Sequence, residues 1–166
     1  MLYAILVDTY EKLEATAKRL EMTDILADLF SKSSPEELEQ VIYLTQGKIH
    51  PDWTGEPEIG MAEKMVIEAI VKATGLKRKT VEDLVSETGD IGHAAERALG
   101  DKRTGMLTRR QLNVVDVYKT LDQISKESGK GSSGRKIDKL VKLMVNSTPL
   151  GARYLARVVV GSSGWV

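Results

Sequence analysis

The chain contains no cysteine, which excludes both a disulfide framework and a thiolate metal site. His50 and His93 alone could supply imidazole; His50 has no second ligand at a useful spacing, and His93 is expected to pack or face solvent beside its helix start. Aromatic residues make up only 5% of the 166 residues, so we expect Trp53 and Trp165 to be core or loop anchors and not base-stacking platforms. The sequence therefore predicts no metal site, no cofactor and no complete catalytic centre.

Long hydrophobic runs are also absent. The apolar run 1–7 is interrupted by Asp8 and Glu11, well short of the roughly 18 to 20 residues that cross a bilayer. It has neither a basic leader nor a small-residue cleavage site, which argues against a secretory signal. We therefore expect a soluble intracellular protein, cytoplasmic or nucleoid-associated, and the length of 166 residues fits one ordinary domain.

The net charge of zero hides a strong polarity along the chain. Residues 1–96 contain 10 Lys+Arg against 19 Asp+Glu, whereas residues 97–166 contain 14 against 5. A chain with one basic half can hold a polyanion on that side and remain soluble overall. The pattern fits nucleic-acid binding. It fits equally well an attraction between the two oppositely charged halves, or between one of them and another protein.

Apolar residues recur at intervals of three and four along most of the chain, as one buried helical face requires. The first such stripe, from Leu6 to Leu20, predicts a helix that runs to about residue 20. Further helices are predicted from about 25 to 47 in two pieces, and at about 61–74, 79–87, 90–99, 113–128, 134–146 and 149–160. No convincing period-two pattern is present, so the expected fold class is all-α, a multi-helix domain.

An internal repeat relates two parts of the chain 114 positions apart. Pro35, expected at the first position of a helix capped by the serines before it, matches Pro149. Gly47 matches Gly161, and apolar residues between these points coincide as well. The repeat predicts a single domain over residues 1–166 with pseudo-twofold halves at about 1–100 and 101–166, the second apparently truncated.

The glycine-rich segment 129–136 has the glycine spacing of a nucleotide-binding P-loop. Arg135 stands in place of the lysine and Lys136 in place of the magnesium-binding hydroxyl, and the preceding element is predicted to be a helix instead of a strand. Nucleotide hydrolysis is therefore not expected. The exposed backbone N–H groups and the positive end of the following helix instead predict a phosphate-binding seat.

The helix after this segment has one apolar and one basic face. Arg135, Lys139 and Lys142 share a face by their spacing, opposite Ile137 and Leu140. Arg153 and Arg157 repeat the spacing of four in the next helix and are expected to extend the positive surface. A second glycine-flanked helix start is expected at Gly89 and Gly92, with Asp90 as its N-cap. The full set of candidate DNA-binding residues is Lys77, Lys79, Gly89, Gly92, Lys102, Arg103, Arg109, Arg110, Lys130, Gly131, Ser132, Ser133, Arg135, Lys136, Lys139, Arg153 and Arg157.

Several stretches, taken in order over nearly the whole chain, resemble the N-terminal DNA-binding domain of archaeal and eukaryotic-type ATP-dependent DNA ligases. They are Glu58-Ile59-Gly60-Met61-Ala62-Glu63-Lys64, Ala73-Thr74-Gly75, Thr88-Gly89-Asp90-Ile91-Gly92, Gly129-Lys130-Gly131-Ser132 with Lys136-Ile137, and Pro149-Leu150-Gly151-Ala152-Arg153-Tyr154-Leu155-Ala156-Arg157.

The resemblance implies a non-catalytic helical domain that binds the minor-groove side of nicked duplex DNA, mostly through phosphates, in replication and repair. Gly131, Ser132, Lys136, Arg153 and Arg157 would then lie near the DNA. Complete ligases carry a K-x-D-G adenylation motif, which is missing here. ATP and magnesium would belong to catalytic domains, which are expected as partners in cis.

Two departures from the family pattern stand out. The segment 161–166 has no basic residue, where the family usually has a glycine- and arginine-rich turn that touches DNA. The segment 105–108 lacks the aromatic pair of a sliding-clamp motif, so clamp binding has little support. The competing prediction is a helical scaffold for protein interactions whose basic C-terminal half docks an acidic partner.

Overall fold

The computed structural model describes residues 1–100, 111–162 and 164–165. Within these ranges the chain forms α-helices and one short 3-10 turn, with no strand. The helices are α1 (Tyr3–Glu14), α2 (Arg19–Lys32), α3 (Leu38–Thr45), α4 (Glu63–Thr74), α5 (Arg78–Thr88), α6 (Ile91–Gly100), α7 (Val114–Lys126), α8 (Ser132–Val145) and α9 (Pro149–Val160), and the 3-10 turn is η1 (Asp52–Thr54). The predicted all-α fold class is confirmed.

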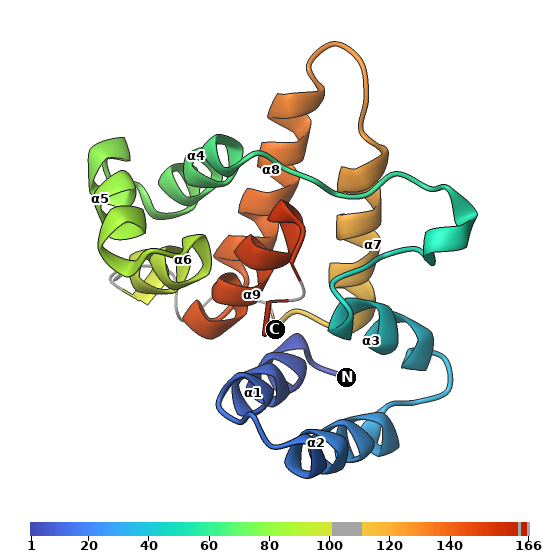
Figure 1. Ribbon diagram of the computed structural model, residues 1–166. Helices are drawn as coiled ribbons and strands as arrows, with labels where there is room; N and C mark the ends of the chain where they lie inside the picture. Colours follow the sequence, from blue (N-terminus) through green and yellow to red (C-terminus); the bar gives the residue numbers. More distant parts are fainter. Residues whose placement is uncertain (101–110, 163, 166) are drawn as a thin grey trace.

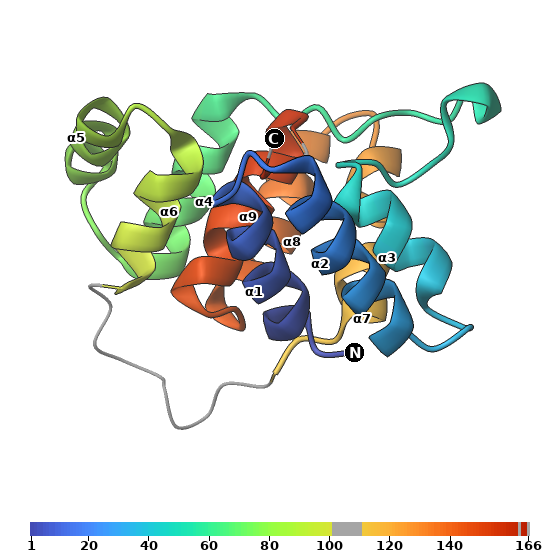
Figure 2. The same ribbon diagram turned by 60° about the horizontal axis from the view of Figure 1, so that its bottom comes forward.

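Helix α9 lies at the centre of the molecule. Figure 1 shows it in front of α8, with α4, α5 and α6 on one side, α7 on the other, and α1, α2 and α3 below. Gly151, Ala152 and every residue from Tyr154 to Val159 are buried, because α9 contacts α6, α1, α4 and α8 together. Figure 2 shows α1 brought forward in front of this central helix, with α2 beside α1 on the side of α3. Side chains that α9 presents to its neighbours are therefore enclosed by them.

The first three helices and the last three contact one another in a similar pattern. Helix α1 contacts α2 and α9, while α7 contacts α8 and α3. The residues just before α1 and α7 also pair with each other: Tyr3 N donates to Leu112 O at 2.9 Å, and Val114 N donates to Met1 O at 2.9 Å. Gly47 and Gly161, matched in the repeat, both have positive φ. A twofold axis relating the two sets of helices stays a prediction.

Two local predictions about the first helices are wrong. Helix α1 ends at Glu14, and Leu20, assigned to its apolar stripe, lies in α2 with 81% of its surface exposed. Helix α3 begins at Leu38 and not at Pro35, and no side chain caps it. Glu37 instead folds back to accept hydrogen bonds from Ser34 N and the N-terminal amino group. At the matching position of α9, Thr148 caps the helix and Pro149 is its first residue, as predicted.

Candidate nucleic-acid interface

The start of α8 has the geometry of an anion seat. Gly131 is the N-cap residue and adopts a left-handed conformation, with φ of 80°. Ser132 N donates to Gly129 O at 3.2 Å, but no side chain caps this helix start, so the N–H groups of Ser133 and Gly134 remain for an anion at the positive end of the helix dipole. Lys130 and Ser133 are exposed beside them and Lys136 is half-buried one turn later.

Arg135 braces the loop that leads into this helix start. Its Nε donates to Glu127 Oε2 at 2.6 Å, Nη1 to Lys130 O at 2.9 Å and Nη2 to Ser128 O at 3.0 Å. Lys139 approaches the other oxygen of Glu127 at 3.3 Å. Hydrogen bonds from Arg135 and Lys139 hold the pKa of Glu127 below its usual value. Arg135 thus fixes the shape of the loop with its own donors, which leaves Lys130 and Lys136 as the unpaired cations of the segment.

The predicted division of α8 into two faces is confirmed. Ile137, Leu140 and Met144 are buried in the core. Arg135, Lys139 and Lys142 line one surface groove of about 350 Å³ between α7 and α8.

Arg153 and Arg157 do not extend this exposed basic face, contrary to the expectation. Arg153 makes two hydrogen bonds of 3.0 Å to Glu96, and a third of 3.0 Å to Glu14. Arg157 donates to Asp90 at 2.7 and 3.0 Å, to Glu14 at 2.7 Å and to Gly164 O. Only 10% of the Arg157 side chain and 12% of the Arg153 side chain is exposed. Both arginines are buried against acids of α1 and α6, and we call this set with Tyr154 the α9 arginine network.

Tyr154 completes the α9 arginine network. Its hydroxyl donates to Glu14 Oε2 at 2.7 Å, and both arginines lie over its ring, with Cζ 5.5 to 5.6 Å from the centroid. Burial alone would raise the pKa of Glu14 and of Asp90. Hydrogen bonds from Tyr154 and Arg157 to Glu14, and from Arg157 to Asp90, outweigh that effect and lower both pKa values. The network therefore joins α1, α6 and α9 through charged groups that stay ionised.

The start of α6 is capped by a side chain, so fewer of its backbone N–H groups are free to bind an anion than expected. Asp90 accepts from His93 N at 2.9 Å, which confirms the predicted N-cap. Gly92 is buried against α9 instead of facing solvent: a Cβ built on it would lie 2.5 Å from Arg157 Nε and 2.8 Å from Arg153 O. Its expected place on an accessible phosphate seat is corrected accordingly, because the absent side chain is what lets α6 and α9 approach. Gly89, which ends α5 with φ of 69°, is exposed.

The remaining candidates divide into two groups. Lys77, just before α5, is exposed, and Lys79 is exposed with its Nζ 3.6 Å from Asp83. Lys102, Arg103, Arg109 and Arg110 fall outside the described ranges, as does the segment 105–108. The structure therefore places Lys130, Gly131, Ser132, Ser133 and Lys136 together.

Sequence reasoning missed Glu14, the acid shared by Arg153 and Arg157. It also missed Trp53, whose expected role as an anchor is wrong because 86% of its surface is exposed. Trp165 is an anchor, as predicted: its indole Nε1 donates to Thr45 O at 3.0 Å. Nor does the sequence predict the contact between His50 and Asp122, whose Nε2 and Oδ1 atoms lie 2.8 Å apart.

Two classes of site find no support in the described part of the chain. No group of three or more His, Cys, Asp or Glu residues there could hold a metal ion. None of its helices is long and apolar enough to cross a membrane.

An uncapped helix start flanked by lysines is a feature that can hold a phosphate group. The family model described as DNA ligase N terminus matches residues 2–163, and the chain belongs to that family. It is 43% identical to DNA ligase 2 of Thermofilum pendens over 166 residues, which cover 96% of this chain and 28% of the relative. It is 40% identical to a DNA ligase of Pyrobaculum islandicum over 97% of this chain and 28% of the relative.

A DNA ligase of Nitrosopumilus maritimus is 37% identical over 98% of this chain and 27% of the relative. The chain thus spans little more than a quarter of the length of these curated relatives. It corresponds to the N-terminal part of a ligase, as the resemblance predicted, and not to the catalytic part.

Proposed function

We propose that this domain binds double-stranded, nicked DNA without sequence specificity, as the non-catalytic N-terminal domain of an ATP-dependent DNA ligase that acts in replication and repair. The observation that carries the proposal is the start of α8, where backbone N–H groups lie on one segment with two unpaired lysines, of which Lys130 is exposed and Lys136 half-buried. Such groups bind phosphates but do not read base edges, which accounts for the absence of sequence specificity.

The proposed contact surface differs from the sequence-based set. Lys130, Gly131, Ser132, Ser133 and Lys136 would contact phosphates directly, with Lys77 and Gly89 as further exposed contributors. Arg135 and Lys139 would act through the loop they brace. Arg153, Arg157 and Gly92 would hold α6 and α9 in place and so set the distance between the exposed helix ends.

The proposal also includes the catalytic domains and their cofactors. ATP, magnesium and the adenylated lysine would be supplied by catalytic domains in cis, because this chain has no K-x-D-G motif. Those domains and the nicked duplex are the proposed partners.

The experiment is a binding titration with a labelled nicked duplex at several salt concentrations. With about six neutralised phosphates, the logarithm of the association constant should fall against the logarithm of salt with a slope near −5. Duplexes of unrelated sequence should bind equally, and an intact duplex measures how much the nick contributes. Binding that is absent, independent of salt or restricted to one sequence would contradict the proposal.

The same titration separates the competing function. A scaffold that docks an acidic protein through the groove between α7 and α8 would bind duplex DNA no better than it binds an acidic polypeptide of equal charge. Preference for the duplex at physiological salt supports the DNA proposal.

A further inference from the structure

The most exposed aromatic side chain among the described residues is Trp53, at the tip of the turn 51–58, which we call the Trp53 turn. Its surface is 86% exposed, although Trp is a residue that is highly buried on average. Every residue from 52 to 58 is exposed, and Figure 1 shows η1 projecting from the edge of the molecule beyond α3 and α7. An apolar group of this size held in water is a feature of interaction surfaces.

The Trp53 turn has a defined shape despite its exposure. Lys48 Nζ lies 2.6 Å from Asp52, Thr54 Oγ1 donates to Pro51 O at 2.8 Å, and Thr54 Oγ1 accepts from Glu56 N at 3.3 Å. Gly55 takes the left-handed conformation that closes the turn, with φ of 70°. A preformed turn loses little conformational freedom when a partner binds, so more of the contact energy remains as affinity.

The charge around Trp53 selects the chemistry of the partner. Asp52 is paired with Lys48. Glu56 and Glu58, in contrast, are exposed and make no ion pair with any described residue, and no Lys or Arg occurs from residue 49 to 63. This local charge repels the phosphates of a nucleic acid and attracts Lys and Arg. A guanidinium or ammonium group is also the charged group that stacks most favourably on an indole ring.

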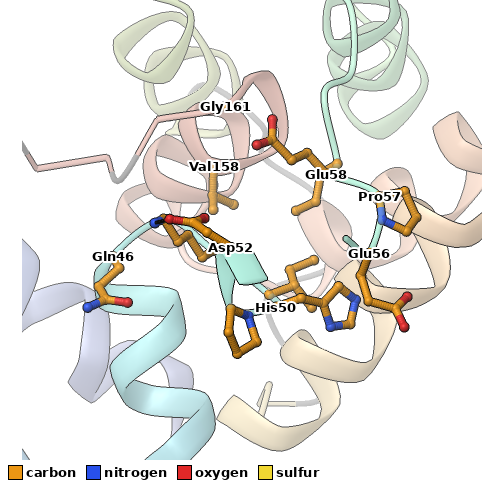
Figure 3. A pocket seen from close by; sticks show the side chains of 13 residues that line it. Gln46, His50, Asp52, Glu56, Pro57, Glu58, Val158 and Gly161 are labelled. Carbon is orange, nitrogen blue, oxygen red and sulfur yellow. Dashed lines mark hydrogen bonds and ion pairs between the residues drawn. The ribbon is translucent and has the colours of Figure 1, made fainter. Parts of the chain in front are cut away.

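A cleft beside the turn adds room for such a side chain. It has a volume of about 380 Å³ and lies between residues 46–59 and the end of α9. Figure 3 shows Glu58 and Val158 on one side of the opening and His50 and Glu56 on another. Val158 and Ile59 provide apolar wall for the aliphatic stem of Lys or Arg, while the carboxylates remain at the opening for its head.

We propose that the Trp53 turn and this cleft form a docking surface for a basic polypeptide segment, with an Arg or Lys of the partner stacked on the Trp53 indole. The surface is separate from the start of α8 and does not depend on the proposed DNA binding. The partner is a protein segment, and a nucleic acid at this surface is the alternative that the experiment must detect.

The experiment follows Trp53 directly by 19F NMR of protein labelled with 5-fluorotryptophan, with Trp53→Phe to assign its resonance. The probes are a short oligo-arginine peptide, an oligo-glutamate peptide of equal length and a nicked duplex, each at about 0.15 M salt to screen diffuse attraction. Oligo-arginine should shift the Trp53 resonance in a saturable way and leave Trp165, bonded to Thr45 O, unchanged.

Variants then test whether Trp53 carries the affinity. Trp53→Ala should weaken binding of labelled oligo-arginine by at least about tenfold, the loss expected for an interface hot spot. Glu56→Gln combined with Glu58→Gln should weaken it severalfold. Leu20→Ala, which truncates another highly exposed apolar residue, is the matched control and should change nothing.

Four results would overturn the proposal: no saturable shift of Trp53 with oligo-arginine, equal shifts of both tryptophans, full affinity in Trp53→Ala, or a Trp53 shift with the duplex in place of the peptide. The last result would assign the turn to nucleic acid. None of these four results depends on whether the start of α8 binds a duplex. The Trp53 proposal and the DNA proposal can therefore be refuted separately.

Discussion

Arg157 of α9 and Asp90 at the start of α6 form a charged pair across the contact between these two helices, with Nη2 2.7 Å from Asp90 Oδ2. Asp90 is at the same time the N-cap that accepts from His93 N. The Asp90 carboxylate thus caps the start of α6 and also binds α9 through Arg157. The guanidinium of Arg157 donates to Glu14 of α1 as well. The arginine closes the interior of the domain and is not available at its surface.

Arg157→Met should destabilise the domain by about 2 to 4 kcal/mol. The change leaves Asp90 without its arginine partner and removes one of the three side chains that donate to Glu14, which costs more than losing an exposed pair would, although both acids keep some exposure. Urea unfolding measures the loss. Lys142→Met, on the exposed face of α8, is the control and should stay within about 0.5 kcal/mol of the parent. Equal stability of the two variants would show that the pair contributes nothing.

The α9 arginine network should make the domain sensitive to acid. The pKa values of Glu14 and Asp90 are lowered from 4.5 and 3.8. At a given acidic pH these two carboxyl groups therefore bind fewer protons in the folded state than in the unfolded state. Their contribution to stability is complete above those ordinary values and is lost as the pH falls through the lower folded values.

The measurement is the free energy of unfolding as a function of pH. In the parent it should decline steadily below about pH 4.5, the ordinary pKa of a glutamate. Glu14→Gln should be less stable near neutral pH and show a shallower decline, because one of the titrating groups is gone. Parallel curves for the two proteins would contradict the assignment of acid sensitivity to Glu14.

Gly92→Ala should destabilise the contact between α6 and α9 by about 1 to 3 kcal/mol, the usual cost of forcing atoms into a packed interface. The added methyl group would lie 2.8 Å from Arg153 O, a backbone atom that cannot turn aside. Gly134→Ala in α8 is the matched control: nothing lies within 4 Å of its Cβ, so the higher helix propensity of Ala should stabilise by up to about 1 kcal/mol. Thermal unfolding of both variants distinguishes these signs, and a stabilised Gly92→Ala would refute the close approach.

Helix positions could be predicted because a buried face leaves a record in the spacing of apolar residues. The end of α1 at Glu14 could not, because Leu20 fits the same spacing although a break precedes it. Likewise the interval of four between Arg153 and Arg157 shows that they share a face of α9, but not what covers that face. Their acid Glu14 is 139 positions from Arg153 in sequence, and only the folded structure brings the two together.

The glycine-rich start of α8 could be predicted because its signal is local. Gly131 provides a left-handed residue and the next residues begin the helix, so sequence neighbours alone define the seat. The role of Arg135 was less accessible: its spacing with Lys139 indicated a basic face correctly, but its contacts with Ser128 O and Lys130 O depend on how the loop closes.

The central claim is that the unpaired cations at the start of α8 meet phosphates while the buried arginines of α9 only hold the helices together. The most direct measurement is the salt dependence of nicked-duplex binding by the parent, by Lys130→Gln combined with Lys136→Gln, and by Arg157→Met, at a temperature where all three are folded. Each lost phosphate contact makes the slope shallower by about 0.9. We predict a change near 1.8 for the lysine pair and none for Arg157→Met, even if its affinity falls. A slope shallower by about 0.9 in Arg157→Met, or unchanged in the lysine pair, would contradict the account.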